Sequence, residues 1–508
     1  MFTIYKTRAA IAASLLLAGC AVGPDYRAPA MPVPDHWDQA HETNPAAQPE
    51  LPQWWMQLND PLLAALIDEA VVGNLNVATA AAKIREARAT YRQAGGALFP
   101  KLTGSASATR SGSGSSAVST ATTSSTGSAT SDGTGSTISL GTVGNTFQAG
   151  FDASWELDLF GANWRALEAA KYGLDAAQWS LRSTLLTLVG DVASYYVQAR
   201  GYQARLALAR NTVKSQEETA RLTRVKFESG ASSGLDAANA AGQAQTTRAT
   251  IPTLQTSYAQ AVHSLSVLTG QAPEELMGRM EKPEAVPVPK LPVPVGIPAD
   301  VLLSRPDVRL AERQYAQYTA KVGQAEAARY PSVSLTGSLS TSGTQIGDLG
   351  MRSTIGWSFG PSLSIPLFNA GKLKAAVEIA QAQRDQYFIA YRSAVLTALK
   401  DVEDASVALS QETGRIDALQ ASVTSYQQAA ILSHSLYAAG STGFLDVLTA
   451  DRSLYSAQDS LIQSRVLVTT DYIALNKALG GGWDGEVDTS KPEVVDTHTG
   501  PHLRQAVQ

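Results

Sequence analysis

The stretch FESGASSGLD at residues 227–236 is repeated, with changes, as YAAGSTGFLD at residues 437–446. Three identical residues recur 210 positions apart, namely Gly230 and Gly440, Leu235 and Leu445, and Asp236 and Asp446. The similarity continues upstream, where LDLFGA (157–162) matches IPLFNAG (365–371) and FPKLTGS (99–105) matches YPSVSLTGS (330–338). A repeat of this length exceeds the roughly 20–50 residues of a solenoid unit. The pattern predicts an internal duplication, in which one fold unit is used twice around a common axis.

Long helices are predicted on both sides of the repeated motif. No proline lies between Phe160 and Pro252 or between Pro366 and Pro492, and apolar residues there recur at alternating steps of three and four. Steps averaging near 3.5 are typical of left-handed supercoiled helices. Helices over 162–228 and 372–439 would each be about 100 Å long at 1.5 Å per residue. Each is expected to end at the glycine motif and to return as a second helix.

Four segments alternate between apolar and polar residues and are predicted strands. They are 102–109, 147–157, 333–341 and 355–365. Alternation gives a sheet one apolar and one polar face, which fits either a half-buried sheet on a soluble core or a sheet in a membrane. Membrane barrels must close and have at least about eight strands. In the membrane interpretation, several chains must therefore share one barrel.

Three segments are predicted to lack regular structure. Residues 104–144 consist almost entirely of Ser, Thr, Gly and Ala, a composition expected for a flexible hairpin tip. The segment 281–299 contains six prolines and is expected to be an extended, semi-rigid linker between the two copies. The polar tail after Trp483 is expected to be loosely held.

The N-terminus has the pattern of an export signal. Lys6 and Arg8 precede a short apolar run, which is followed by Leu-Ala-Gly-Cys ending at Cys20. This resembles a lipobox and predicts that Cys20 is acylated, the alternative being a plain secretory signal. Because Cys20 is the only cysteine, no internal disulfide is possible.

Composition argues against several classes of function. The net charge is −5 and only 17% of residues are charged, so neither nucleic acid nor an anionic surface is predicted as a partner. The six histidines are scattered, and the sequence has no His-Glu-x-x-His motif and no phosphate-binding glycine loop. We therefore predict no enzymatic activity, no catalytic residues and no metal site.

Six stretches together resemble the TolC-like outer-membrane efflux factors, in the lipoprotein branch that serves RND-type tripartite efflux pumps. They are LAGCAVGPDY (17–26), WWMQLNDPLLAALIDEAVVGNLNV (54–77), LTGQAP (268–273), GIPADVLLSRPDVRLAERQ (296–314), LTADRSLYSAQ (448–458) and ALGGGWD (478–484). The resemblance implies an α+β membrane protein. Three chains, each giving four strands, would build a 12-stranded outer-membrane β-barrel continuous with a long periplasmic α-helical barrel.

The same resemblance implies a function and partners. The protein would be the outer-membrane exit duct of a tripartite efflux system, passively conducting drugs or other small toxic compounds from the periplasm to the exterior. Its partners would be two further copies, a periplasmic adaptor protein, an inner-membrane RND pump and outer-membrane lipid. No cofactor is expected apart from the covalent lipid at Cys20. The alternatives are a duct of a type I secretion system and a coiled-coil periplasmic lipoprotein without a pore.

The motifs and the duplication predict six segments. These are a signal peptide (1–19), an anchor and equatorial segment (20–60), a first repeat (61–280), the linker (281–299), a second repeat (300–483) and a tail (484–508). Within the first repeat we expect a hairpin at about 101–159, a long helix at 162–228 and a return helix at 235–270. Within the second repeat the corresponding elements are expected at about 332–367, 372–439 and 444–480.

The resemblance places a periplasmic gate at the two glycine motifs. LDVLTA (445–450) matches the family's aspartate motif, so that Asp446 takes the first aspartate position and Leu445 forms an apolar ring beside it, whereas Thr449 replaces the second aspartate. Rings of carboxylates raise the local density of cations, and rings of leucine exclude water. Asp451 and Arg452 lie about one turn further on, and Asp236 is the counterpart of Asp446 in the first copy.

Each gate assignment has a structural alternative. Asp236 and Asp446 both open a predicted helix, where a carboxylate caps backbone N–H groups. The capping and gating roles are compatible with each other. Arg452 is either a polar lock to a neighbouring helix or part of a solvated helix face.

Overall fold

The computed structural model describes residues 21–34, 37, 52–112, 143–291, 301 and 304–494. Several predictions fall outside these residues: the signal peptide, the acylation of Cys20, most of the loop 104–144, the end of the linker and the end of the tail. The described chain divides into two compact units. The first comprises the described residues within Met1–Asp25, Tyr91–Ala169 and Thr319–Ala382, and the second comprises the described residues within Tyr26–Thr90, Ala170–Tyr318 and Gln383–Gln508.

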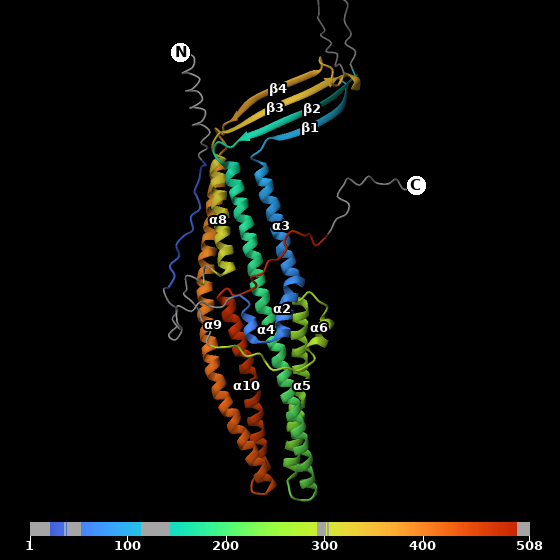
Figure 1. Ribbon diagram of the computed structural model, residues 1–508, viewed down its shortest axis with the longest axis vertical. Coiled ribbons are helices and arrows are strands. Elements are labelled where there is room, and N and C mark those ends of the chain that lie inside the picture. The colour runs from blue at the N-terminus through green and yellow to red at the C-terminus, as the bar shows by residue number, and fades with distance from the viewer. Residues whose placement is uncertain are drawn as a thin grey trace, which may run out of the picture. The chain divides into compact units, whose positions relative to one another are not determined.

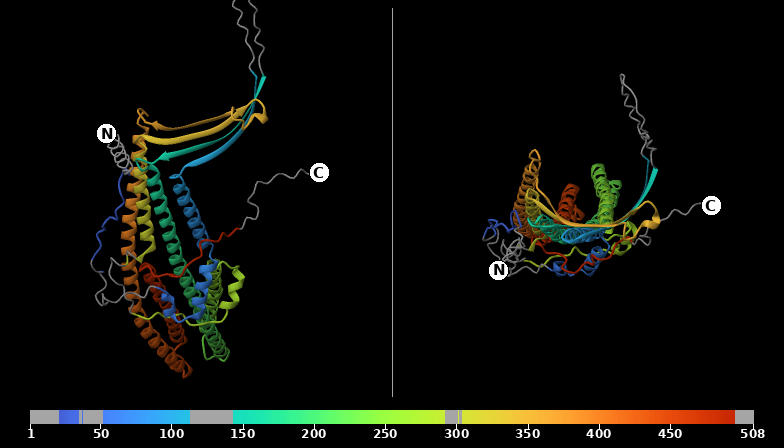
Figure 2. Two further views of the ribbon diagram at one scale, coloured as in Figure 1. Left: turned by 45° about the horizontal axis from the view of Figure 1, so that its top comes forward. Right: turned by 90° about the horizontal axis from the view of Figure 1, so that it is seen from above.

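The first unit contains a four-stranded antiparallel sheet. Its strands are β1 (Lys101–Gly112), β2 (Val143–Leu157), β3 (Ser332–Gly343) and β4 (Ile355–Ser364), in the order β1-β2-β3-β4. The sheet is curved rather than flat (Figure 2). β1 and β4 are its edge strands, and they come from different copies of the repeat.

One face of this sheet is apolar and uncovered. Phe151 lies opposite Leu339, and Leu339 lies opposite Trp357, so the large side chains share a face. Phe151 is 57% exposed and Trp357 is 78% exposed. No described part of the chain buries this face, and the interpretation as a half-buried sheet on a soluble core is therefore wrong.

The hairpin tip begins later than predicted. The predicted strand 102–109 overlaps the predicted loop 104–144, and in the overlap the strand is confirmed: β1 continues to Gly112, and residues 104–112 are each paired in register with β2. Low hydrophobicity predicts a loop only where apolar burial has to offset the cost of ordering the chain. Here the backbone hydrogen bonds of a strand pair order a segment whose small polar side chains need no core.

Helices are the main other element of the described chain, and turns and extended segments such as 21–34, 281–291 and 481–494 have no regular secondary structure (Figure 1). The helices are η1 (Trp54–Leu58), α2 (Pro61–Gly73), α3 (Leu75–Gly96), α4 (Ala162–Glu228), α5 (Gly234–Leu268), α6 (Pro273–Met280), α8 (Pro306–Ala327), η2 (Ile346–Asp348), α9 (Lys372–Ala438) and α10 (Phe444–Ala478). α4 and α9 each have 67 residues, and the return helices α5 and α10 each have 35. The two copies therefore match in helix length as well as in sequence.

The core of the second unit joins α2, α4, α5 and α10 around the N-terminal tryptophans. Trp54 is 1% exposed, its ring meets that of Tyr472 edge-on at 5.8 Å, and its Nε1 donates to the carbonyl of Gly481 at 3.2 Å. Buried aromatic rings with satisfied polar atoms contribute large apolar area at low cost. Segments from both ends of the sequence are thus held in one core.

Asp60 connects this core to the start of α2. Its Oδ1 accepts the N–H groups of Leu62 and Leu63 at 3.0 and 3.1 Å, which makes it the N-cap. Its Oδ2 accepts the hydroxyl of the fully buried Tyr196 at 2.6 Å. Burial, together with the hydrogen bond to Asp60, raises the pKa of Tyr196. Arg200, 1% exposed, donates to the same hydroxyl at 3.0 Å.

The start of the tail is better held than predicted. Thr489 is 9% exposed, and Nη1 of Arg85 on α3 donates to the carbonyl of Lys491 at 2.7 Å. Side-chain bonds to backbone carbonyls order such a segment without requiring apolar residues. The other residues of 484–494 are exposed except for the half-buried Val487, and the segment has no helix or strand, so these two contacts hold only part of a tail that otherwise fits the prediction.

In the part of the chain that the structure describes, no single helix is both long enough and apolar enough to cross a membrane. Only α2 and α3 taken together, with a bend between them, reach that length and composition.

Asp60→Ala is expected to destabilise the second unit. It removes a helix cap, worth about 1–2 kcal/mol, and one partner of a buried hydroxyl. The thermal midpoint of unfolding should fall, as followed by circular dichroism. Asp68→Ala, an exposed position on the same helix, is the matched control and should leave the midpoint nearly unchanged. An unchanged midpoint for Asp60→Ala would contradict the role of this cap.

Candidate functional site: the paired helix-hairpin tips

Both long helices end through a glycine in the left-handed conformation. Gly230 has φ 77° and Gly440 has φ 73°. The amide that follows each glycine donates back into the last turn, from Ala231 to the carbonyl of Lys226 at 2.7 Å and from Ser441 to that of Leu436 at 2.9 Å. Glycine adopts this conformation without a Cβ penalty and lets the turn satisfy the last carbonyls. This geometry explains why the glycine recurs in both copies.

α5 begins with a complete capping box. The hydroxyl of Ser233 accepts the N–H of Asp236 at 3.1 Å, and the Asp236 carboxylate accepts the N–H of Ser233 at 3.3 Å. Ser232 also donates its hydroxyl to that carboxylate at 3.1 Å. The N-cap is therefore Ser233, and Asp236 is the third helical residue. The capping alternative for Asp236 is therefore confirmed in a modified form: its carboxylate accepts a backbone N–H group at the start of α5, but from the third helical position of a capping box rather than from the N-cap position.

α10 begins differently, at Gly443, which has no side chain to cap the helix. The Asp446 carboxylate accepts the hydroxyl of Thr442, and Thr449, in the position of the family's second aspartate, donates its hydroxyl to the carbonyl of Leu445 at 2.8 Å. Leu445 is 66% exposed. The Asp446 carboxylate, which lies next to the exposed Leu445, thus accepts fewer hydrogen bonds than the Asp236 carboxylate.

The two tips of one chain pack against each other (Figure 1). Phe444, Val447 and Leu448 of α10 are buried together with Ala240 of α5. The Nζ of Lys226 on α4 lies 3.9 Å from the centroid of the Tyr437 ring on α9. A cation above an aromatic face is worth about 0.5–1 kcal/mol at an exposed site. The contact between the hairpins is therefore small.

Arg452 provides a polar link across the same contact. Its Nε donates to Oε1 of Gln243 on α5, in the other hairpin. Arg452 is exposed, and a single hydrogen bond at an exposed site is weak and readily exchanged for water. This geometry fits a lock between neighbouring helices better than a solvated face without a partner.

Asp451 has a partner that the sequence did not suggest. Its Oδ1 and Oδ2 lie 2.9 and 3.1 Å from Nε2 of His434, so the pair joins α9 to α10. The hydrogen bond to Asp451 raises the pKa of His434 above its ordinary value of 6.5. The two residues are 17 positions apart on different helices, and only the folded hairpin brings them together.

The pairs Arg452 with Gln243 and Lys226 with Tyr437 were also missed. They lie 209 and 211 positions apart, close to the period of the duplication. This spacing could have indicated both pairs from the sequence, because equivalent positions in two copies around one axis are candidates for contact.

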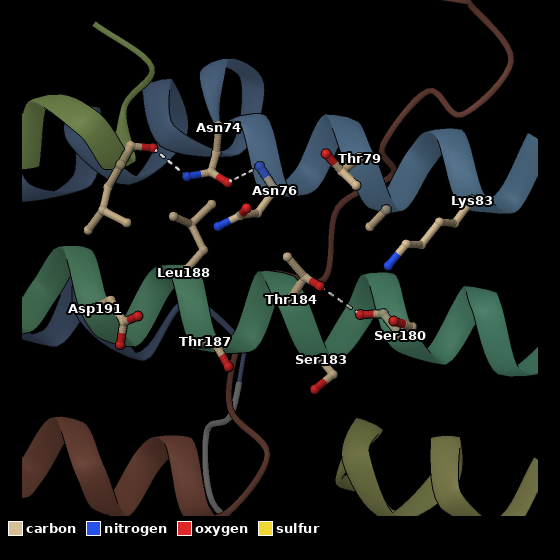
Figure 3. A pocket seen from close by; sticks show the side chains of 12 residues that line it. Asn74, Asn76, Thr79, Lys83, Ser180, Ser183, Thr184, Thr187, Leu188 and Asp191 are labelled. Carbon is tan, nitrogen blue, oxygen red and sulfur yellow. Dashed lines mark hydrogen bonds between the residues drawn. The ribbon is translucent and has the colours of Figure 1, made fainter. Parts of the chain in front are cut away.

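A second feature of the second unit is a polar pocket of about 400 Å³ between α3 and α4 (Figure 3). Ser180, Ser183, Thr184 and Thr187 line the α4 side. Lys83 extends toward them from α3 (Figure 3). The lining contains no histidine or cysteine.

No group of three or more metal-ligating side chains occurs among the described residues. The described carboxylates at the tips therefore do not form a coordination shell.

Residues 66–271 and 297–481 match the model of a protein family described as "Outer membrane efflux protein". The chain belongs to this family. The two matched segments lie on either side of the proline-rich linker, as expected for a duplicated unit.

The similarity to individual relatives covers nearly the whole length of this efflux protein. Nodulation protein T of Rhizobium leguminosarum bv. trifolii is 37% identical over 472 residues, covering 93% of this chain and 96% of the relative. The antibiotic efflux pump outer membrane protein ArpC of Pseudomonas putida is 34% identical over 478 residues, covering 92% of this chain and 94% of the relative. The solved structure of the outer-membrane channel OprN has a TM-score of 0.82 at 32% identity, covering 91% of this chain and 100% of that one.

These findings confirm the predicted fold class, the outer-membrane location and the role as an efflux channel. Family membership does not test the individual tip residues. The gate roles of Leu445, Asp446, Asp451, Arg452 and Asp236 therefore stay predictions.

His434 is expected to give the α9–α10 hairpin a pH-dependent stability. Because the folded-state pKa is raised, the added stability is fully present below 6.5, the value of the free side chain, and is lost as the pH rises through the higher folded-state value. The thermal midpoint of unfolding of the wild-type protein should therefore exceed that of His434→Asn at about pH 6, and this difference should disappear by about pH 9. His263→Asn, on the exposed side of α5, is the control. A difference independent of pH would refute an ionic contribution from the pair.

Proposed function

We propose that this protein is the outer-membrane exit duct of a tripartite efflux system, built from three copies of the chain. Its cargo would be drugs or other small toxic compounds, passed from the periplasm to the exterior. The observation that carries the proposal is the four-stranded sheet, with two open edges and one uncovered apolar face.

A sheet with open edges is unstable in the hydrocarbon core of a membrane, because each unpaired backbone group there costs several kcal/mol. Pairing β1 of one copy with β4 of the next removes both edges, and three copies give twelve strands. The opposite face then lines the passage. It carries small hydroxyls, such as Ser338 opposite Ser358 with their oxygens 2.8 Å apart, and such a wall suits hydrated cargo of varied chemistry.

The start of the described chain supports a lipid anchor at Cys20. Val22, two residues later, donates its N–H to the carbonyl of Phe160 at 3.1 Å. Arg165, 4% exposed, donates to the carbonyls of Val22 and Gly23, each at 3.2 Å. All of these residues belong to the first unit with the sheet. Acyl chains on Cys20 would therefore start next to the junction of β2 and α4.

The helix-hairpin tips are proposed as the periplasmic gate. Asp446 would give a ring of three carboxylates, and the exposed Leu445 an apolar ring beside it. Asp451 would act through its bond to His434, and Arg452 through its bond to Gln243. Asp236 would have a local role, because its carboxylate is engaged in the capping box of α5.

The energy for transport would come from partners, namely a periplasmic adaptor and an inner-membrane RND pump. ArpC, a relative at 34% identity, carries the name of an antibiotic efflux pump component. We infer no enzymatic activity and no cofactor other than the lipid. A coiled-coil lipoprotein without a pore would leave the amphipathic sheet unexplained.

In planar bilayers, the purified protein is expected to give stepwise conductance as a trimer. Asp446→Ala should raise the single-channel conductance and weaken block by multivalent cations about tenfold, equivalent to about 1.4 kcal/mol, because three carboxylates leave the constriction. Asp417→Ala, an exposed carboxylate on α9, is the charge-matched control and should change neither property.

Two results would count against this proposal. A reconstituted sample that stays monomeric and passes no ions would reject the duct itself. Unchanged conductance and block for Asp446→Ala, in a protein that does conduct, would remove only Asp446 from the gate.

A further inference from the structure

A buried amide without partners lies in the seam between α4 and α5. Ala209, Val213, Gln216, Ala220 and Thr223 recur at steps of four and three and therefore share one face of α4. Gln216 is 6% exposed, and neither its Oε1 nor its Nε2 has a hydrogen-bond partner among the described residues. A buried amide in this state is costly and favours any conformation in which water reaches it.

The facing stretch of α5 is weak for a separate reason. The ion pair between Glu217 and Arg248 fixes the level of α5 that lies opposite Gln216. Thr247, 2% exposed, places a further polar group in the seam there. One turn on, Pro252 lies inside α5 and has no N–H, so the carbonyl of Arg248 loses its regular helical donor. Helices bend at such positions.

The second copy provides an internal comparison at the same level. Positions 210 residues later than Thr247 and Pro252 are Ala457 and Ile462, and α10 contains no proline. Val423, Ala457 and Leu461 form a buried apolar cluster there. At this level the α9–α10 seam therefore holds an apolar cluster and no proline, whereas the α4–α5 seam holds the unpartnered Gln216 beside Pro252, although α4 and α5 also share an apolar cluster that includes Leu254.

We propose that Gln216, Thr247, Arg248 and Pro252 form a hinge, and that the tip of the α4–α5 hairpin bends at this hinge when the gate opens. The α9–α10 hairpin, which has no equivalent, moves as a stiff rod or stays in place. Bending hydrates Gln216 and separates Gln243 from Arg452, the weak polar link between the tips. The hinge thus favours the open state, and the contacts between the tips favour the closed one.

This inference rests on the proposed function only in assigning the bend to gate opening, since the bend itself is measurable without transport. Hydrogen–deuterium exchange of the trimer in lipid nanodiscs compares residues 237–251 with their counterparts 447–461. In the wild type, amides of the first segment should exchange roughly tenfold faster. Pro252→Ala and Gln216→Leu should each slow the amide exchange of residues 237–251 toward the rate of residues 447–461. Pro252→Ala restores a backbone N–H donor within α5, and Gln216→Leu removes the buried amide that has no hydrogen-bond partner.

Gln255→Leu, the same substitution at an exposed position on α5, is the matched control and should leave the exchange unchanged. Equal rates for the two segments in the wild type would overturn the hinge. So would rates that neither Pro252→Ala nor Gln216→Leu alters. Both variants remove a destabilising feature, so loss of folding in either would also contradict the inference.

Bilayer recordings separate this inference from the proposed function. If the wild type conducts, Pro252→Ala and Gln216→Leu should lower the open probability several-fold and leave the conductance of the open channel unchanged. Conduction with unaltered open probability would reject the gating role of the hinge and keep the duct. A wild type that never conducts would reject the duct, and the exchange data would then stand only as evidence of a flexible hairpin.

Discussion

The structure depends on one constraint: a sheet of four strands cannot satisfy its own edges. β1 and β4 each present a row of backbone groups without partners in the sheet, and the large side chains of one face are uncovered. In water such a sheet would be a site of aggregation, and in a bilayer it would be unstable. Both problems disappear when copies of the chain join edge to edge. The sheet thus requires assembly, because a single copy of the chain cannot form a stable sheet in water or in a bilayer.

The duplication shows how one fold unit gives two different hairpins. Both copies keep the left-handed glycine and the same helix lengths, because the turn geometry is needed twice. They differ where the turn enters the return helix. Ser233 completes a capping box in the first copy, whereas Gly443 in the second leaves Asp446 largely free. They differ again in the seam, where Pro252 has Ile462 as its counterpart. As a result, the first hairpin has the capped helix start and the proline, and the second has the less engaged carboxylate and no proline.

Features with a strong periodic signal could be predicted from the sequence. The supercoil spacing predicted α4 and α9 with nearly the observed bounds, and the alternation of apolar residues predicted the shared face of β2 and β4. Contacts between distant side chains could not be predicted. The partnership of His434 with Asp451 depends on the rotation of α9 and α10 about their axes, which the sequence leaves open.

Composition was misleading in two places for related reasons. By composition residues 104–112 look like a loop, although the alternation of apolar residues predicted a strand as far as residue 109, and in-register pairing with β2 makes all of them strand. Residues 484–494 look loosely held, but Thr489 is buried and Arg85 binds the backbone there. In both cases hydrogen bonds to backbone groups contribute to the ordering, and the hydrophobicity of the segment does not reveal them.

The central claim is that β1 of one chain pairs with β4 of another. It is tested most directly by disulfide cross-linking in outer membranes, with Thr103→Cys on β1 combined in turn with cysteine at Ser358, Gly360 or Ser362 on β4. We predict that at least one combination gives covalently linked dimers and trimers on oxidation, because neighbouring strands bring Cα atoms within about 4.4–6.8 Å. Monomers alone at every register, with both thiols shown to be reactive, would contradict the account.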